Sequence, residues 1–162
     1  MKLENIPIEE RYRRAIAGDA LIVAALTRAV YEKYGDEGIK TLQKGMERTG
    51  RELAKALAKH FDIRVGNGDV TDYAKFVDFF HQVSLMDTKT VELSPKRWVV
   101  HATSCPAAAQ YKRIFPDFCP WVLVALDRGM SSVVNKKIKA WMTEKCLARG
   151  DDYCEYIFEL ED

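Results

Sequence analysis

The 162-residue sequence predicts an α+β fold, with N-terminal helices followed by a four-stranded antiparallel sheet (ββααββ) packed against helices. Two observations predict this class. Apolar residues recur at helical spacing as far as about residue 86, and beyond it the period changes to two in two pairs of short segments. Helices that are segregated from antiparallel strand pairs indicate α+β rather than a parallel α/β sheet.

The totals are those of an ordinary globular protein, with 48% apolar and 30% charged residues. We expect a single domain over 1–162, with a helical part at 1–87 and a ββααββ ligand-binding part at 88–162. A net charge of +1 indicates neither nucleic-acid nor membrane partners. The N-terminus has no apolar run after its charges, so we expect no signal peptide and a cytoplasmic protein with reduced cysteines.

The first part of the chain predicts three helices. The first covers about residues 8–34 and is broken by Gly35-Asp36, and the second covers about 37–60. Residues 61–69, FDIRVGNGD, predict a loop that matches no phosphate or dinucleotide fingerprint. The third helix, 70–86, carries a phenylalanine cluster beside His81, which is either a partly exposed helix residue or a ligand contact.

The first strand pair is predicted at 89–93 and 97–104, around the turn Ser94-Pro95-Lys96. A two-residue loop would place Val91 and Leu93 on the same face as Trp98, Val100 and Ala102. The opposite face would hold Thr90, Glu92, Val99, His101 and Thr103. His101 would then point toward solvent or a cleft.

A short helix at 107–113 and a longer one at about 117–134 are expected next. Cys119 would lie in the first turn of the longer helix. Exposed amides and the helix dipole there can lower the pKa of a thiol, whereas the alternative is a buried cysteine that packs as a small hydrophobic residue.

The end of the chain, 137–162, predicts a hairpin around the turn ARGDD. A three-residue loop sets Cys146 across from Cys154 and Glu144 across from Tyr156. Glu144 would be the one carboxylate on an apolar face, where burial raises a carboxyl pKa and favours a general acid, a general base or an anchor for a ligand. A one-residue slip would instead turn Glu144 outward.

Two further groups of residues are candidates for metal binding or catalysis. The four thiols of the chain are possible metal ligands, with zinc as the candidate metal, although their spacing follows no zinc-ribbon pattern: Cys105, Cys119, Cys146 and Cys154. His101 and Cys105, four residues apart and grouped with Asp127, could form a nucleophile–base pair if the strand end bends.

Three segments together carry a family resemblance: HATSCP, then FPDFC with Asp127 further along its helix, then CLARGDDYCEYIFEL. From about Ala29 to Leu160 the chain resembles the L-2-amino-thiazoline-4-carboxylic acid hydrolase-like family and the related vinyl-4-reductase small-molecule-binding domain. The resemblance implies a cytoplasmic α+β domain with a ligand pocket between sheet and helix, often as a homodimer. It implies recurring roles for these residues: Cys105, Cys119, Asp127, Gly150, Asp151 and Cys154.

One departure bears on activity. The resemblance implies a second cysteine shortly before the aspartate, but this chain has PWVLVALD there. Three readings follow. The first is a small-molecule-binding domain whose pocket is lined by Phe76, Phe80, Trp98, Met142, Tyr156 and Phe158. The second is a hydrolase that opens a small cyclic amidine or thiazoline, with Cys105 or Cys119 as nucleophile and His101 or Glu144 as proton carrier. The third is a cysteine-ligated zinc protein.

Overall fold

The computed structural model describes residues 6–162 and confirms the α+β class. Its helices are α1 (Ile8–Leu57), α2 (Val70–Val83), α3 (Ala108–Ile114), the π-helix η2 (Cys119–Leu123), α4 (Val124–Val134) and the 3₁₀-helix η3 (Leu147–Arg149). Its strands are β1 (Asp87–Leu93), β2 (Arg97–Ser104), β3 (Ile138–Met142) and β4 (Cys154–Leu160). Residues 1–5, where the stretch that argues against a signal peptide begins, lie outside the described residues. Within residues 6–162, no helix combines the length and apolarity needed to cross a membrane.

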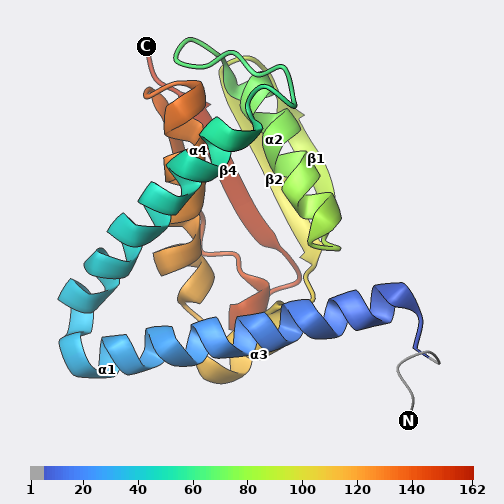
Figure 1. The fold of residues 1–162 in the computed structure, drawn as a ribbon, viewed down its shortest axis with the longest axis vertical. Coiled ribbons are helices and arrows are strands. Elements are labelled where there is room, and N and C mark those ends of the chain that lie inside the picture. Colours follow the sequence, from blue (N-terminus) through green and yellow to red (C-terminus); the bar gives the residue numbers. More distant parts are fainter. Residues whose placement is uncertain (1–5) are drawn as a thin grey trace.

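The first two predicted helices form one bent element, α1. Gly35 has φ 56° and ψ −142°, a conformation that glycine adopts without a Cβ clash, and the helix axis turns there as predicted. Figure 1 shows the two arms of α1 meeting at this bend, with the first arm crossing one end of the molecule and the second rising beside α4. The bend lets one helix cover two sides of the core.

The second arm of α1 packs closely on α4, through glycines on both helices. A Cβ on Gly50 would lie 2.2 Å from the Leu126 carbonyl oxygen, and one on Gly129 would lie 2.1 Å from the Glu47 carbonyl oxygen. Two of the glycines that lower helix propensity therefore sit where the two backbones need close approach. The predicted 117–134 helix is split, because its first turn is the π-helix η2, a form common near functional sites.

The sheet has strand order β1-β2-β4-β3, and every pair is antiparallel. The helix α2 lies across β1 and β2, and α4 lies beside it on the same face (Figure 1). That face holds buried side chains from both central strands: Trp98, Val100, Ala102, Cys154, Tyr156 and Phe158. The hydrophobic core lies between this face and the helices.

The prediction of which β1 side chains point to which face of the sheet is partly wrong, because a bulge shifts the register between Thr90 and Glu92. Thr90 pairs with Val100, and its hydroxyl accepts a 3.1 Å hydrogen bond from the Trp98 indole N–H. Val91 is left 54% exposed instead of packing beside Val100. The indole donor needs a partner when buried, and Thr90 supplies it.

The register of the closing hairpin also differs from the prediction. Met142, not Glu144, lies across from Tyr156. The Thr143 amide donates to the Glu155 carbonyl and the Glu155 amide donates to the Lys145 carbonyl, so Glu144 is left out of the ladder. This arrangement packs Met142 against the margin of the core and leaves the Glu144 side chain fully exposed beside Arg149, 3.0 Å away.

Candidate functional site

A wall of aromatic rings lines the inner face of the sheet. Trp98 and Phe158 are paired across β2 and β4 and stack with centroids 5.1 Å apart, and Tyr73 from α2 meets Phe158 at 4.9 Å. Phe76 and Phe80, one turn apart on α2, lie 5.8 Å from each other. All but Phe80 are nearly inaccessible to solvent.

The six residues predicted to line a ligand pocket therefore lie in one core. Four are buried (Phe76, Trp98, Tyr156 and Phe158), whereas Phe80 and Met142 are partly exposed at its margin. The surface hollows at the α1 bend and at the α1–α4 seam are lined by other residues. The predicted lining is thus a packed cluster, with Phe80 at its more accessible edge.

His81 stands at the end of this aromatic wall, in the last turn of α2. Its ring lies 6.4 Å from the Trp98 ring and is 9% exposed. Its Nδ1 is buried and has no hydrogen-bond partner among the described residues. Burial lowers the pKa of His81 to about 4, so the imidazole is neutral at neutral pH. The sequence placed His81 beside the phenylalanines but left its burial open.

Asp127 of α4 contacts the same core through Tyr73. The Tyr73 hydroxyl donates a 2.8 Å hydrogen bond to its Oδ1. Burial raises the pKa of Asp127 to about 6, against the lowering effect of that hydrogen bond. Asp127 thus meets a tyrosine, not the predicted His101–Cys105 pair.

The four cysteines gather near the start of α4 and the η3 turn. The Cys146 and Cys154 sulfurs are 3.9 Å apart and both residues are buried. Cys119 is buried beside Cys146, and Cys105 is close enough for its charge state to affect Cys119 and Cys154. The final loop closes this group, because Gly150 adopts φ 102° and the Asp151 carboxylate accepts a 2.9 Å bond from the Cys146 amide.

The thiols differ in acidity. Hydrogen bonds from Cys119 and Cys154 lower the pKa of Cys146, and the same bonds raise the pKa of both donors. The pKa of Cys105 is raised, mainly by burial. Of the two alternatives predicted for Cys119, the structure shows the buried cysteine, because η2 buries the thiol and makes it a donor.

The predicted proton carriers face other partners. His101 lies on the outer face of the sheet, where its Nε2 is 2.8 Å from Glu155 and its ring stacks on Tyr153 at 4.1 Å. Glu144 is exposed, and the expectation that it lies on the apolar face is wrong. Neither side chain is brought to the thiols by the strand register.

The donor set for a metal is partly in place. Tetrahedral zinc with sulfur at about 2.3 Å implies sulfurs about 3.8 Å apart, which matches the Cys146–Cys154 pair. Within the described part of the chain, however, no group of three or more His, Cys, Asp or Glu side chains is arranged to hold an ion. A zinc site at the four thiols stays a prediction.

Residues 13–158 match the family model described as L-2-amino-thiazoline-4-carboxylic acid hydrolase. No curated protein sequence matches the chain. The match covers nearly all of the described helices and strands, and it includes every cysteine.

Solved structures with a similar fold are distant in sequence. The phenol-responsive sensory domain of the transcription activator PoxR, solved with phenol, has a TM-score of 0.63 at 13% identity, covering 87% of this chain and 74% of that one. A trafficking protein particle complex subunit 3 from Naegleria fowleri, covalently bound to palmitic acid, has a TM-score of 0.47 at 12% identity, covering 89% and 96%. At these identities the likeness to PoxR shows a shared fold.

Proposed function

Because the chain belongs to the L-2-amino-thiazoline-4-carboxylic acid hydrolase family, whose members act on small molecules as that name says, we propose that it is a small-molecule-binding domain. The ligand is a compact apolar or aromatic molecule with one hydrogen-bonding group. It lies against the aromatic wall, with that group on His81.

The buried, unpartnered Nδ1 of His81 carries this proposal. A buried polar atom without a partner costs about 1–3 kcal/mol, so a native fold retains one where something else satisfies it. The neutral imidazole can serve a hydroxyl or an N–H group, and Trp98 beside it offers an aromatic face. The site is thus polar at one point and apolar around it, as ligand sites are.

The proposed approach to His81 is at the end of α2. Phe80 and Met86 are only partly buried there. Leu85, in the turn that follows, has φ 53°, a left-handed conformation that a branched side chain rarely adopts. This left-handed residue ends α2, and the Met86 amide beside it donates to the His81 carbonyl. The PoxR domain, which shares this fold, is described as phenol-responsive, and phenol has the chemistry that His81 and the aromatic wall suit.

Phenol and toluene are the probes that test this function, because they differ mainly in the hydroxyl. We expect phenol to bind the wild-type chain in calorimetry, toluene to bind about tenfold more weakly, and His81→Leu to erase the difference, since one hydrogen bond is worth roughly 1–3 kcal/mol. His60→Leu, at an exposed histidine, is the matched control. Equal binding of both probes by the wild type, or phenol binding unchanged in His81→Leu, would refute the proposal.

Hydrolysis of a thiazoline or cyclic amidine ring is the alternative function. It needs a nucleophile beside a base. The pKa of Cys105 and of Cys119 is raised, and His101 and Glu144 have partners elsewhere. Turnover of L-2-amino-thiazoline-4-carboxylic acid, lost in Cys119→Ser, would support the hydrolase.

A cysteine-ligated zinc ion is a second candidate, favoured by the sulfur spacing of Cys146 and Cys154. A bound zinc would fix the final loop against η2, with Cys119 and Cys105 as the further ligands. Metal content, measured by mass spectrometry on protein purified without chelator, tests it. One zinc per chain, lost in Cys154→Ser, is the expected result.

The partner copy of a homodimer is proposed to cover the first arm of α1. Large apolar side chains are exposed along this arm, with Ile22, Leu26 and Tyr34 at 59%, 63% and 57%. An apolar hollow of about 370 Å³, lined partly by Val30 and Leu42, continues this surface around the bend. Exposed apolar surface of this extent marks an interaction site.

A further inference from the structure

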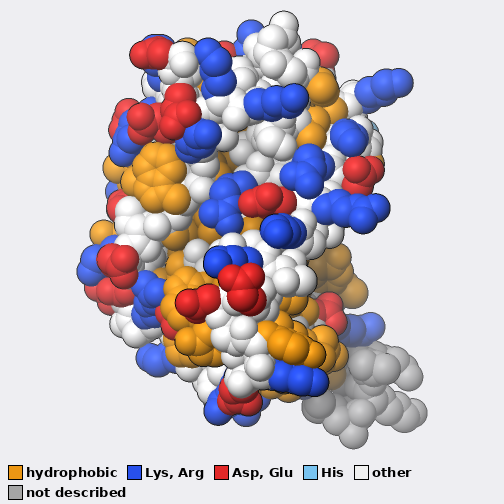
Figure 2. All heavy atoms as spheres, turned by 90° about the vertical axis from the view of Figure 1, so that its left-hand side faces the viewer, with side chains coloured by type: hydrophobic (Ala, Val, Ile, Leu, Met, Phe, Trp, Pro, Cys, Tyr) orange, Lys and Arg blue, Asp and Glu red, His pale blue; other side chains and the backbone are white. Residues whose placement is uncertain are grey.

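A basic groove runs along the seam between the second arm of α1 and the end of α4. Two adjoining hollows form it, of about 990 and 240 Å³, and they share Arg51, Ser132 and Lys136. Six cations line the groove: Arg51, Lys55, Arg128, Lys136, Lys137 and Lys139. The one acidic residue in the lining is Glu47. Figure 2 shows Lys and Arg side chains gathered over the upper half of the face that includes α1.

Several of these cations have no anionic partner in the described structure. No ion pair within residues 6–162 involves Arg51, Lys136 or Lys137. The Arg128 Nε is buried 3.3 Å from Glu47 but makes no hydrogen bond. Cations at Lys136 and Lys137 complement the C-terminal end of α4, but Arg51 and Arg128 lie within helices, so the helix dipole does not explain them.

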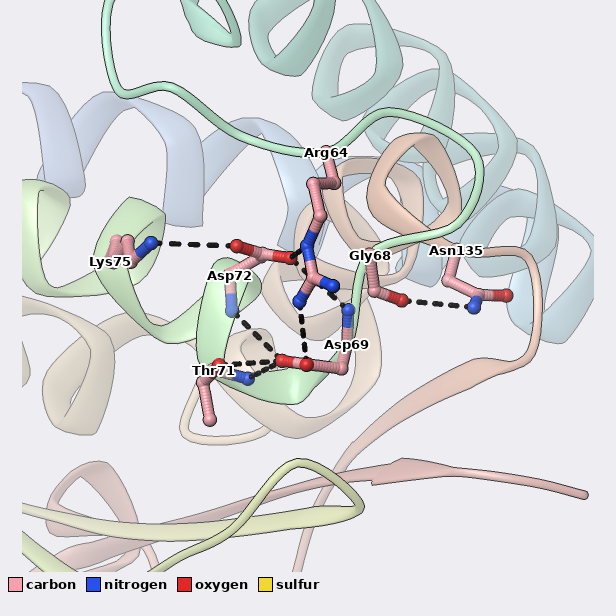
Figure 3. A network of polar contacts seen from close by, with 7 residues as sticks. All are labelled: Arg64, Gly68, Asp69, Thr71, Asp72, Lys75 and Asn135. Atoms are coloured by element: carbon pink, nitrogen blue, oxygen red, sulfur yellow. Dashed lines mark hydrogen bonds and ion pairs between the residues drawn. The ribbon is translucent and has the colours of Figure 1, made fainter.

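One side of the groove is formed by the loop after α1, which is held in place by ion pairs and hydrogen bonds. Val65 and Gly66, in the loop after α1, line the larger hollow. Figure 3 shows how this loop is held, by Arg64 on Asp69 and Asp72 and by a 3.0 Å bond from the Asn135 amide to the Gly68 carbonyl. A preformed groove lowers the entropic cost of binding.

The near wall is the outer edge of β3. The Ile138 N–H donates to the Asn135 carbonyl there and its C=O accepts from the Ser131 hydroxyl, so the free part of the edge begins after Ile138. In the described sheet, β3 is an edge strand, and its segment Ile138–Ala140 bounds the smaller hollow. Ladder bonds flank β3 at Lys137–Glu161 and Thr143–Glu155. Because bonded and non-bonded pairs alternate in an antiparallel ladder, the Ala140 N–H and C=O face the free edge. Such an edge accepts an extended peptide as an additional strand.

We propose that this groove docks an acidic, extended peptide segment of a protein partner. The segment pairs its backbone with β3 and places its carboxylates on Arg51, Arg128 and Lys136. The lining contains no aromatic residue, which disfavours single-stranded nucleic acid, because that ligand uses stacking platforms. The apolar lining, which includes Val65, Val133 and Ile138, suits the alternate side chains of a strand.

Fluorescence polarisation with a labelled eight-residue peptide of alternating Glu and Val tests this proposal. We expect binding that weakens with salt and falls about tenfold or more in the double variant Arg51→Glu/Lys136→Glu. Lys89→Glu/Lys112→Glu, at two exposed lysines outside the groove, changes net charge equally and should leave binding within about twofold. A proline in the middle of the peptide should abolish binding, because it removes a backbone donor.

A charge swap separates loss of docking from loss of folding. The Arg51→Glu/Lys136→Glu variant should bind a peptide of alternating Lys and Val that the wild type does not bind. The proposal is overturned if the acidic peptide does not bind the wild type, if the two double variants behave alike, or if the proline peptide binds as well as the parent. Displacement of the peptide by a short DNA duplex at equal phosphate concentration would also overturn it, in favour of a general polyanion site.

Discussion

Tyr73 and Asp127 join α2 to α4 through a 2.8 Å hydrogen bond from the phenol hydroxyl to the carboxylate. The bond lies at one side of the aromatic wall, because the Tyr73 ring also meets Phe158. His81, on the same helix as Tyr73, lies beside Trp98, which also stacks on Phe158. Asp127 and His81 are thus connected through packed rings.

Asp127→Asn is expected to raise stability at neutral pH. The pKa of Asp127 is about 6 in the folded chain and 3.8 ordinarily, so the folded state binds more protons between these values. Stability from this group is present below pH 3.8 and is lost as pH rises through 6, by about 3 kcal/mol. The amide retains an acceptor for Tyr73 without the buried charge. Urea unfolding of the wild type and the variant at pH 4.5 and 7.5 measures the change in the free energy of unfolding. An equal change at both pH values would contradict this reasoning.

His81→Leu is expected to show the opposite dependence. Burial lowers the pKa of His81 from 6.5 to about 4, so the unfolded state binds more protons between these values. Its contribution is present above pH 6.5 and is lost as pH falls through 4, by about 3 kcal/mol. Replacing His81 by leucine removes this loss of stability at low pH. The wild-type stability should therefore change little between pH 4.5 and 6, since the two groups offset each other, and each single variant should reveal a slope. If the stability of either single variant depended as little on pH as that of the wild type, the idea that Asp127 and His81 offset each other would be contradicted.

Leu26→Glu is expected to convert a dimer into a monomer. Leu26 is 63% exposed at the centre of the apolar stripe on α1, and a buried carboxylate at an interface without a partner is costly. Light scattering after size-exclusion chromatography measures the mass. Thr49→Glu, at an exposed position on the second arm, is the control and should leave the dimer intact. A monomeric wild type would show that the stripe has some other role.

The periodicity of the sequence predicted the fold class, and the Gly35-Asp36 dipeptide predicted the bend in α1, because both depend on local signals. It did not predict the bulge at Val91 or the loss of Glu144 from the ladder. A bulge depends on partners in the other strand, here the Trp98 indole that needs Thr90 and the Glu155 backbone that bonds both Thr143 and Lys145. The cysteine pair was predicted together despite the wrong register, because the η3 turn returns Cys146 to Cys154.

The site was predicted less well than the fold. The six side chains predicted to line a ligand pocket lie together in or beside one core. The predicted proton carriers, His101 and Glu144, face outward. Burial of His81 depends on the packing of α2 on Trp98, and the basic groove joins residues from α1, α4 and β3. Contacts between residues so far apart in the chain cannot be read from a short stretch of sequence. The position of His81 next to three phenylalanines was the available signal.

Gly129→Ala is expected to destabilise the chain more than any exposed substitution, because its Cβ would lie 2.1 Å from the Glu47 carbonyl oxygen. Backbone cannot move aside as a flexible side chain can, so α1 and α4 must separate, at a cost of roughly 2–4 kcal/mol. Gly45→Ala is the matched control, since a Cβ there meets nothing within 4 Å. It should stabilise α1 by up to about 1 kcal/mol. Chemical denaturation of both variants measures the difference, and equal midpoints would show that the close crossing of the two helices is not required.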